Sequence, residues 1–222
     1  MDRPDIQEID FSPSREDFCG FCRLLYDRHL AAGVGGNVAA RCGNRIWLTS
    51  TGCSLRDVQP ENIAVVDMEG LLIQGERPTK EAGMHLGVLL ARPDMNVVCH
   101  LHGANIIAAS TLLDPGPTSL PALTPGFVYH AFPLPMLPFM VPGSPDLAKS
   151  VTEALSDKRT CAILLKNHGL VTTGKDFWEA LNIAEEIDEA ARVYVLTAGK
   201  APPIPREDID RIKSLGISEL SH

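Results

Sequence analysis

Three histidines in two short motifs are the residues of this chain best suited to binding a metal ion. His100 and His102 lie within VVCHLHG at residues 97–103, and His168 lies within LLKNHGL at residues 164–170. In an extended strand, side chains at i and i+2 share one face and lie roughly 6–7 Å apart. A third histidine at the end of another apolar strand would complete the three-nitrogen set of catalytic zinc, which leaves one coordination position open. A lone histidine is better interpreted as a buried, hydrogen-bonded core residue, but this combination favours a metal site.

Glu81 is the next candidate, because it begins a predicted helix directly after a turn fixed by Pro78. A carboxylate is favoured there by the helix dipole, so a glutamate in a first helical turn needs no function to explain it. Beside a three-histidine metal, however, a carboxylate is what proton abstraction next to a carbonyl requires. We therefore expect Glu81 to act as acid and base, and we expect His85, on the same helix, to pack against it or orient it.

Two glycine-containing turns could bind an anion. They occupy residues 35–37 (GGN) and 49–52 (TSTG). Glycine lets backbone N–H groups approach an anion closely, and hydroxyls add donors, although turn formation alone explains most such glycines. Thr79 and Lys80 would supply further donors and one cation, enough for a phosphate monoester. The first turn is not a dinucleotide-binding fingerprint, because Val38 stands where a third glycine belongs and no strand precedes it.

The overall composition is that of an ordinary globular protein. Of 222 residues, 45% are hydrophobic and 22% charged, and the net charge is −8. No block of basic residues stands out, so we expect neither nucleic-acid nor membrane-surface binding. The first residues lack the apolar core of a signal peptide, and no apolar run approaches the ~18 residues of a membrane helix. These observations predict a cytoplasmic protein.

Six cysteines invite the question of disulfides or a zinc ribbon. Cys19 and Cys22 form one C-x-x-C pair, but no second pair exists to complete a tetrahedral site. We interpret all six as reduced, mostly buried small hydrophobic residues.

Hydrophobic periodicity and turn signals predict one α/β domain over residues 1–222. Its core is expected at about 14–198 and a C-terminal tail with one short helix at 199–222. Ser14 with Asp17 should form a capping box, and Thr79 should cap the helix that contains Glu81. Hairpins outnumber strand–helix–strand units, which indicates a three-layer α/β/α arrangement with a mostly antiparallel central sheet. Helices are predicted at 14–32, 80–91, 104–112, 145–155 and 176–197, and strands at 37–42, 45–49, 63–67, 71–74, 96–102, 160–166 and, within a proline-rich segment, 135–139.

The motifs in this order resemble the class II aldolase/adducin family. The resemblance rests on G-G-N, L-T-x-T-G, P-[ST]-x-E, H-x-H and N-H-G, which together span roughly residues 14–198. That family includes fuculose-phosphate and rhamnulose-phosphate aldolases, ribulose-5-phosphate 4-epimerase and 3-oxo-tetronate 4-phosphate decarboxylase. Each motif is weak alone, whereas the ordered set is highly specific.

The resemblance implies a site that composition and spacing do not show. It places one divalent ion per subunit on His100, His102 and His168, with Zn²⁺ as first choice and Mn²⁺, Co²⁺ or Fe²⁺ as alternatives, and it makes Glu81 the acid and base. It also implies a homotetramer with active sites at subunit interfaces and a small phosphorylated sugar or sugar acid as substrate. The residues implied to bind the substrate phosphate are Gly36, Asn37, Thr51, Gly52, Thr79 and Lys80.

The chain departs from the fuculose-phosphate aldolase pattern at its expected proton donors. That aldolase has a tyrosine in the loop after H-x-H, where Thr124-Pro125 stands here, and another in its C-terminal tail, whereas no tyrosine follows Tyr194. Lys80 replaces a hydroxyl residue before the glutamate. The lysine and the Thr-Pro pair look more like the 3-oxo-tetronate 4-phosphate decarboxylases of this family.

Several reactions therefore stay open, because aldol cleavage, 3-oxo-acid decarboxylation and 4-epimerisation share an enolate or enediolate that a divalent ion stabilises. Our first choice is a metal-dependent lyase that cleaves a carbon–carbon bond of a phosphorylated ketose by a retro-aldol reaction. Decarboxylation of a phosphorylated 3-oxo sugar acid is second, and ribulose-phosphate 4-epimerisation is third. A non-catalytic, adducin-like assembly module is disfavoured because it needs no metal, and an Fe(II) oxygenase with the same ligands is a remote alternative.

Overall fold

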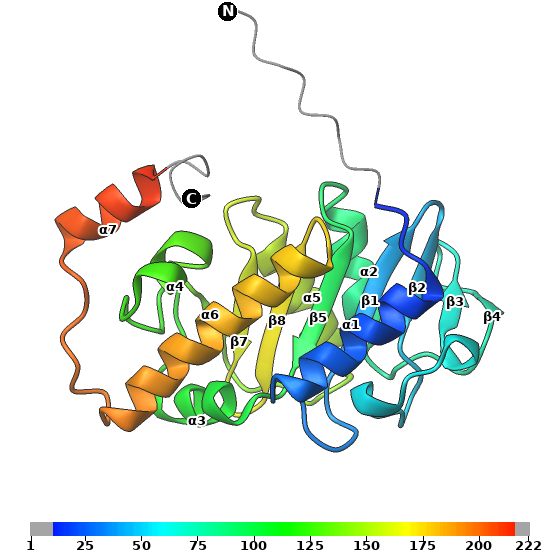
Figure 1. Ribbon diagram of the computed structural model, residues 1–222, viewed down its shortest axis with the longest axis horizontal. Coiled ribbons are helices and arrows are strands. Elements are labelled where there is room, and N and C mark those ends of the chain that lie inside the picture. The colour runs from blue at the N-terminus through cyan, green and yellow to red at the C-terminus, as the bar shows by residue number, and fades with distance from the viewer. Residues whose placement is uncertain (1–10, 216–222) are drawn as a thin grey trace, which may run out of the picture.

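In the computed structural model, which describes residues 11–215, helices lie on both faces of an eight-stranded sheet (Figure 1). The strands are β1 (Asn37–Cys42), β2 (Arg45–Leu48), β3 (Ala64–Val66), β4 (Leu72–Gln74), β5 (Val97–Leu101), β6 (Met136–Leu137), β7 (Ala162–Leu165) and β8 (Gly169–Gly174). The helices are α1 (Arg15–Asp27), α2 (Ala82–Ala91), α3 (Ala104–Leu112), α4 (Pro125–His130), α5 (Pro145–Leu155), α6 (Phe177–Leu196) and α7 (Arg206–Ser214).

The strand order is β4-β3-β2-β1-β5-β8-β7-β6. Strand β6 pairs parallel with β7, whereas the other neighbouring strands pair antiparallel. The expected α/β class is confirmed, and the sheet is mixed rather than simply antiparallel. The parallel pair arises because α5 connects β6 to β7, a strand–helix–strand crossover that hairpin counting does not weigh.

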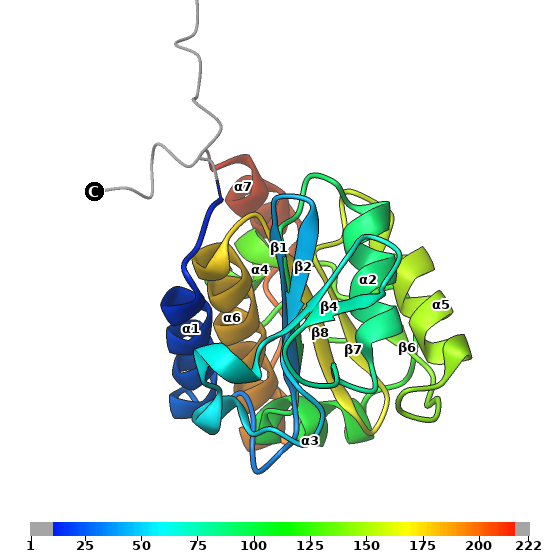
Figure 2. The same ribbon diagram turned by 90° about the vertical axis from the view of Figure 1, so that its right-hand side faces the viewer.

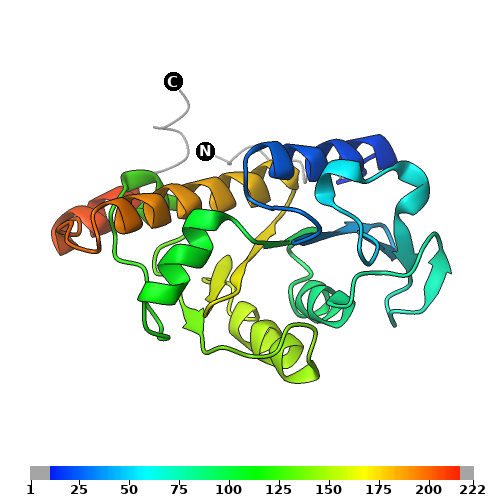
Figure 3. The same ribbon diagram turned by 90° about the horizontal axis from the view of Figure 1, so that it is seen from below.

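The two faces of the sheet carry separate hydrophobic cores. Helices α1 and α6 cover one face, and α2 and α5 cover the other (Figures 2 and 3). Along β5, Val97, Cys99 and Leu101 belong to the core under α1 and α6, whereas Val98 belongs to the core under α2 and α5. This period-two alternation puts His100 on the same face as Val98, toward α2.

The residues that cap the starts of α1 and α2 can be compared with those predicted from the sequence. The predicted capping box of α1 is confirmed, because Ser14 Oγ accepts from Asp17 N at 3.1 Å and Asp17 Oδ2 accepts from Ser14 N at 2.9 Å. The predicted cap of α2 is wrong: Glu81, not Thr79, is the N-cap residue. Thr79 N instead donates to Thr49 O at 3.0 Å, and this strand-like contact keeps the chain extended before the helix begins.

One strand and one α-helix of the structure are not among those expected from the sequence. Strand β8 follows β7 after a short turn, and α4 begins within the proline-rich segment, where Thr124 Oγ1 accepts from Phe127 N and Pro125 occupies the first turn. Six cysteines are free thiols, as expected. Within residues 11–215, no helix combines the length and the apolar character needed to cross a membrane.

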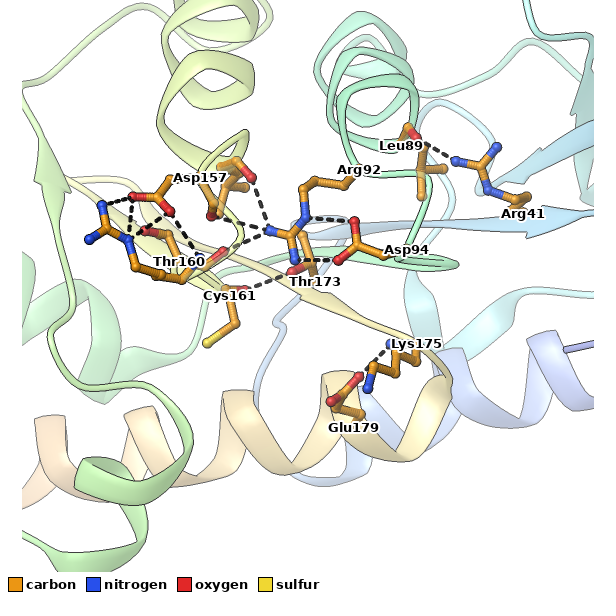
Figure 4. A network of polar contacts seen from close by, with 12 residues as sticks. Arg41, Leu89, Arg92, Asp94, Asp157, Thr160, Cys161, Thr173, Lys175 and Glu179 are labelled. Carbon is orange, nitrogen blue, oxygen red and sulfur yellow. Dashed lines mark hydrogen bonds and ion pairs between the residues drawn. The ribbon is translucent and has the colours of Figure 1, made fainter. Parts of the chain in front are cut away.

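A buried arginine connects the elements at the far end of α2 (Figure 4). Arg92 is 1% exposed, and its Nη1 donates to Leu155 O and to Thr160 O, each at 3.0 Å. Its Nε and Nη2 donate to the two carboxylate oxygens of Asp94 at 2.9 and 3.0 Å. One guanidinium therefore joins the ends of α2 and α5 to the chain just before β7.

Arg92→Ala should lower the free energy of unfolding by about 3 kcal/mol or more, because it leaves buried carbonyl acceptors without donors. Urea denaturation followed by circular dichroism measures this loss. Arg159→Ala is the matched control, because Arg159 pairs with Asp157 nearby while its side chain is 90% exposed. A loss for Arg92→Ala no greater than that of the control would show that the buried network is not stabilising.

Candidate metal centre

Strand pairing brings the two histidine motifs together. His100 lies on β5 opposite Val171 of β8, and His168 lies in the turn between β7 and β8. Asn167 makes that turn possible with φ of 55°, a left-handed conformation that asparagine tolerates better than most residues. His102 follows β5 two residues after His100 and points to the same side, as predicted.

The three imidazoles converge on one point. His100 Nε2 lies 2.8 Å from His102 Nε2 and 3.2 Å from His168 Nε2. Together the three residues can offer ligand atoms that all lie within 4.8 Å of one another. Ligand nitrogens 2.0–2.1 Å from a tetrahedral zinc ion would be about 3.3 Å apart, so the observed spacing is close to that of a bound set.

The protonation of the cluster also suits a metal. His100 Nδ1 lies 3.1 Å from Leu170 O, to which it donates, so Nε2 is the bare nitrogen that faces His102 and His168. Burial, followed by the neighbouring His102 and His168, holds the pKa of His100 well below its usual value. Burial likewise lowers the pKa of His102 and of His168. Neutral imidazoles at neutral pH are the form that binds a divalent ion, and the residues present therefore fit one.

Glu81 lies beside this cluster at the start of α2. Its Oε2 is 3.3 Å from His100 Nε2 and accepts a hydrogen bond from Asn37 Nδ2 at 2.9 Å. Its Oε1 is buried and makes no hydrogen bond to residues 11–215. One carboxylate oxygen is thus held in place, while the other remains available for a proton.

His85 reaches Glu81 through an intermediary that was not expected from the sequence. It is fully buried, burial lowers its pKa to about 3, and its Nε2 lies 2.5 Å from Asn37 Oδ1. Asn37 stands opposite His100 in the pairing of β1 with β5, which places its amide between His85 and Glu81. No local motif reveals this link, because it joins a strand to a helix far along the chain.

Two motif glycines make room for His102. A Cβ at Gly35 would lie 2.6 Å from His102 Nδ1, and a Cβ at Gly169 would lie 2.3 Å from Leu101 O and 3.0 Å from His102 Cδ2. The distances of 2.6 and 2.3 Å are shorter than real Cβ contacts, so a side chain at Gly35 would displace the imidazole and one at Gly169 would displace the backbone. Close packing around His102 and Leu101 therefore explains why both positions are glycine.

The residues proposed to bind phosphate gather around the ends of β1 and β2. Thr49 N donates to Val38 O at 3.0 Å, which sets the turn that contains Thr51 and Gly52 beside the chain that enters β1 at Gly36 and Asn37. Thr51 N donates to Arg77 O at 2.9 Å, so this turn also lies next to the segment before α2.

Thr79 and Lys80 differ in their surroundings. Thr79 is 8% exposed, and its Oγ1 accepts from Glu81 N at 3.3 Å. Lys80 is exposed and, with Glu81, lines a pocket of about 340 Å³ that extends to the start of α5. Lys80 and Glu81 thus line the same pocket.

Comparisons with known proteins identify the family of the chain. The family described as "Class II Aldolase and Adducin N-terminal domain" matches residues 16–195. An L-fuculose phosphate aldolase of Methanococcus maripaludis is 38% identical over 81% of this chain and 96% of its own length. A 3-oxo-tetronate 4-phosphate decarboxylase of Haemophilus influenzae is 36% identical over 80% of this chain and 85% of its own.

A solved structure shows the same fold. The crystal structure of YgbL from Klebsiella pneumoniae superposes with a TM-score of 0.82 at 30% identity, covering 89% of this chain and 96% of that one. The family match covers most of the residues that the structure describes. The chain is an enzyme of the class II aldolase and adducin family.

Proposed function

We propose that the protein is a metal-dependent lyase that cleaves a phosphorylated ketose by a retro-aldol reaction, giving dihydroxyacetone phosphate or a close relative. The observation that carries this proposal is the convergence of three imidazoles next to Glu81, whose second carboxylate oxygen is buried without a partner among the described residues. The aldolase relative in Methanococcus maripaludis supports the same reaction class.

In this proposal His100, His102 and His168 hold one divalent ion per subunit, with zinc as first choice and manganese, cobalt or iron(II) as alternatives. When bound, the ion supplies Lewis-acid stabilisation of the negative charge that develops next to the substrate carbonyl. In the cleavage direction, the hydroxyl next to the scissile bond loses its proton to solvent and becomes the carbonyl of the aldehyde that leaves, while the electron pair of the broken carbon–carbon bond stays with the other fragment as an enediolate. Glu81, in its acid form, then gives a proton to the enediolate carbon at which the bond was broken. In the condensation direction, the Glu81 carboxylate removes that proton.

The substrate phosphate would be held by Gly36, Asn37, Thr51, Gly52, Thr79 and Lys80. Backbone N–H groups, hydroxyls and one ammonium group supply charge-assisted hydrogen bonds to such an anion. The Asn37 side chain contacts Glu81 and His85, so its contribution would come from its backbone or from the second hydrogen on Nδ2. A homotetramer with active sites at the subunit interfaces remains part of the proposal, and light scattering tests it.

Lys80→Ala should weaken the binding of a phosphorylated substrate about 10–150-fold, because one charge-assisted hydrogen bond is worth about 1.5–3 kcal/mol. Steady-state kinetics with a phosphorylated substrate and its unphosphorylated analogue measure this effect. Lys149→Ala, which removes an exposed lysine from α5, is the matched control. It should leave the kinetics with both substrates unchanged. Equal losses for both substrates with Lys80→Ala would contradict a phosphate contact.

Decarboxylation of a phosphorylated 3-oxo sugar acid is the second candidate, and two observations favour it. The decarboxylase relative from Haemophilus influenzae is nearly as similar as the aldolase relative. In addition, the Thr124 hydroxyl caps α4, and no tyrosine follows Tyr194 in the sequence. Decarboxylation needs no proton donor for an aldehyde, because carbon dioxide leaves and only the remaining enolate carbon takes a proton. Ribulose-phosphate 4-epimerisation ranks third.

A substrate panel separates these reactions. The metal-loaded protein is incubated with ketose phosphates and with phosphorylated 3-oxo acids. A trapped aldehyde identifies the aldolase, evolved carbon dioxide identifies the decarboxylase, and an isomerised pentulose phosphate identifies the epimerase. No product from any ketose phosphate would overturn our first choice.

A further inference from the structure

Three side chains from two elements form a polar chain that ends at the metal centre. His85 lies on α2, Asn37 lies on β1, and Glu81 is the N-cap of α2. His85 Nε2 is 2.5 Å from Asn37 Oδ1, and Asn37 Nδ2 is 2.9 Å from Glu81 Oε2. Glu81 Oε2 in turn lies 3.3 Å from His100 Nε2.

The direction of each hydrogen bond in this chain follows from the groups present. An ionised carboxylate only accepts, so the Asn37 nitrogen must face Glu81 and the Asn37 oxygen must face His85. That oxygen also accepts only, which requires His85 Nε2 to carry the proton. His85 Nδ1 is buried without a partner among residues 11–215, and a bare nitrogen there avoids the cost of an unpaired buried N–H.

We propose that His85 is a positioning residue: its Nε2–H fixes the orientation of the Asn37 amide, and the amide then holds Glu81 against the metal centre. Without that donor, the amide could rotate by half a turn and present its oxygen to Glu81. Two acceptors at the observed separation of 2.9 Å would repel each other, and the carboxylate would move. The consequence for turnover rests on the proposed function, whereas the orientation of the amide does not.

Packing alone does not account for this histidine. His85 is completely buried between α2 and the sheet, where an aliphatic side chain would avoid the cost of burying an imidazole. Among residues 11–215, the one hydrogen bond of its side chain goes to Asn37, the residue that holds Glu81.

Two substitutions in the full-length, metal-loaded protein test the proposal. His85→Leu keeps the volume but removes the donor, and should lower kcat about 10–100-fold, the scale of a small misplacement of a reacting group. KM and metal content should stay within about twofold. His85→Gln, whose amide nitrogen can donate to Asn37 Oδ1, should recover most of kcat. Equal losses of kcat in the two variants, or a change confined to KM, would overturn the positioning role.

Nitrogen NMR of protein labelled with ¹⁵N-histidine provides a readout that needs no substrate. The His85 signal is assigned by its disappearance in His85→Leu and should report a neutral ring protonated at Nε2. Asn37→Leu should shift this signal, because it removes the acceptor. A ring protonated at Nδ1, or a signal unchanged by Asn37→Leu, would overturn the proposal. If the wild-type protein acts on no sugar phosphate but the NMR result is as expected, the proposed function fails and the orientation of the amide stands.

Discussion

Alanine in place of His100, His102 or His168 is expected to remove most of the bound divalent ion and nearly all turnover. Each histidine supplies one of three converging nitrogens, and His100 is completely buried between the other two. Removing a group that only hydrogen-bonds to a metal ligand lowers metal affinity or activity about 10–100-fold. Removing a ligand itself should therefore lower them at least about 100-fold. Metal content after dialysis, measured by plasma mass spectrometry, and turnover are the two readouts.

His130→Ala is the matched control, because His130 lies exposed on α4 and is not part of the cluster. It should retain the metal content and turnover of the wild type. Full metal occupancy in all three single variants would show that these histidines do not form the site. Loss of metal in only one variant would reduce the ligand set to that residue and partners not yet identified.

Glu81→Gln is expected to bind metal nearly normally but to lose turnover by about 10²–10⁴-fold, the usual value of general acid–base assistance. Glutamine keeps the shape and can still accept from Asn37 Nδ2, but it cannot take up or release the substrate proton. The variant should also stop exchanging the carbon-bound hydrogen of the substrate with deuterated water. Turnover, mass spectrometry of the substrate and metal content measure the three effects separately.

Glu16→Gln changes a glutamate in the first turn of α1 and serves as the control for Glu81→Gln. It should leave turnover and hydrogen exchange unchanged. If Glu81→Gln also keeps near wild-type turnover and exchange, Glu81 is only a residue at a helix start. The proton would then have to be moved by another group.

The histidine positions could be predicted because they depend on local rules. Side chains two residues apart on a strand share a face, and His100 and His102 obey this rule whatever the strand pairs with. The meeting of His168 with this pair depends on β8, which was not expected from the sequence. Its six residues include two glycines, and their pairing with β5 is decided by tertiary contacts rather than by local preference.

The role of Asn37 shows a second limit of sequence reasoning. The G-G-N turn indicates an anion site, yet the amide of Asn37 contacts Glu81 and His85. Those contacts join residues more than forty positions apart, so no spacing within one segment reveals them. The start of α4 is a different case, because Thr124-Pro125 is a recognisable local signal for a helix beginning.

The pairing of β5 with β8 has a consequence for the order of folding events. His102 and His168 become neighbours only when a long stretch of intervening chain has closed into the sheet, and closing such a loop costs entropy before any ligand can be shared. A divalent ion would therefore find its complete set of ligands only after the central strands have paired, so its binding energy stabilises the finished sheet rather than an early intermediate. Peptides that contain only one of the two histidine motifs would not reproduce the site, however well each motif is preserved.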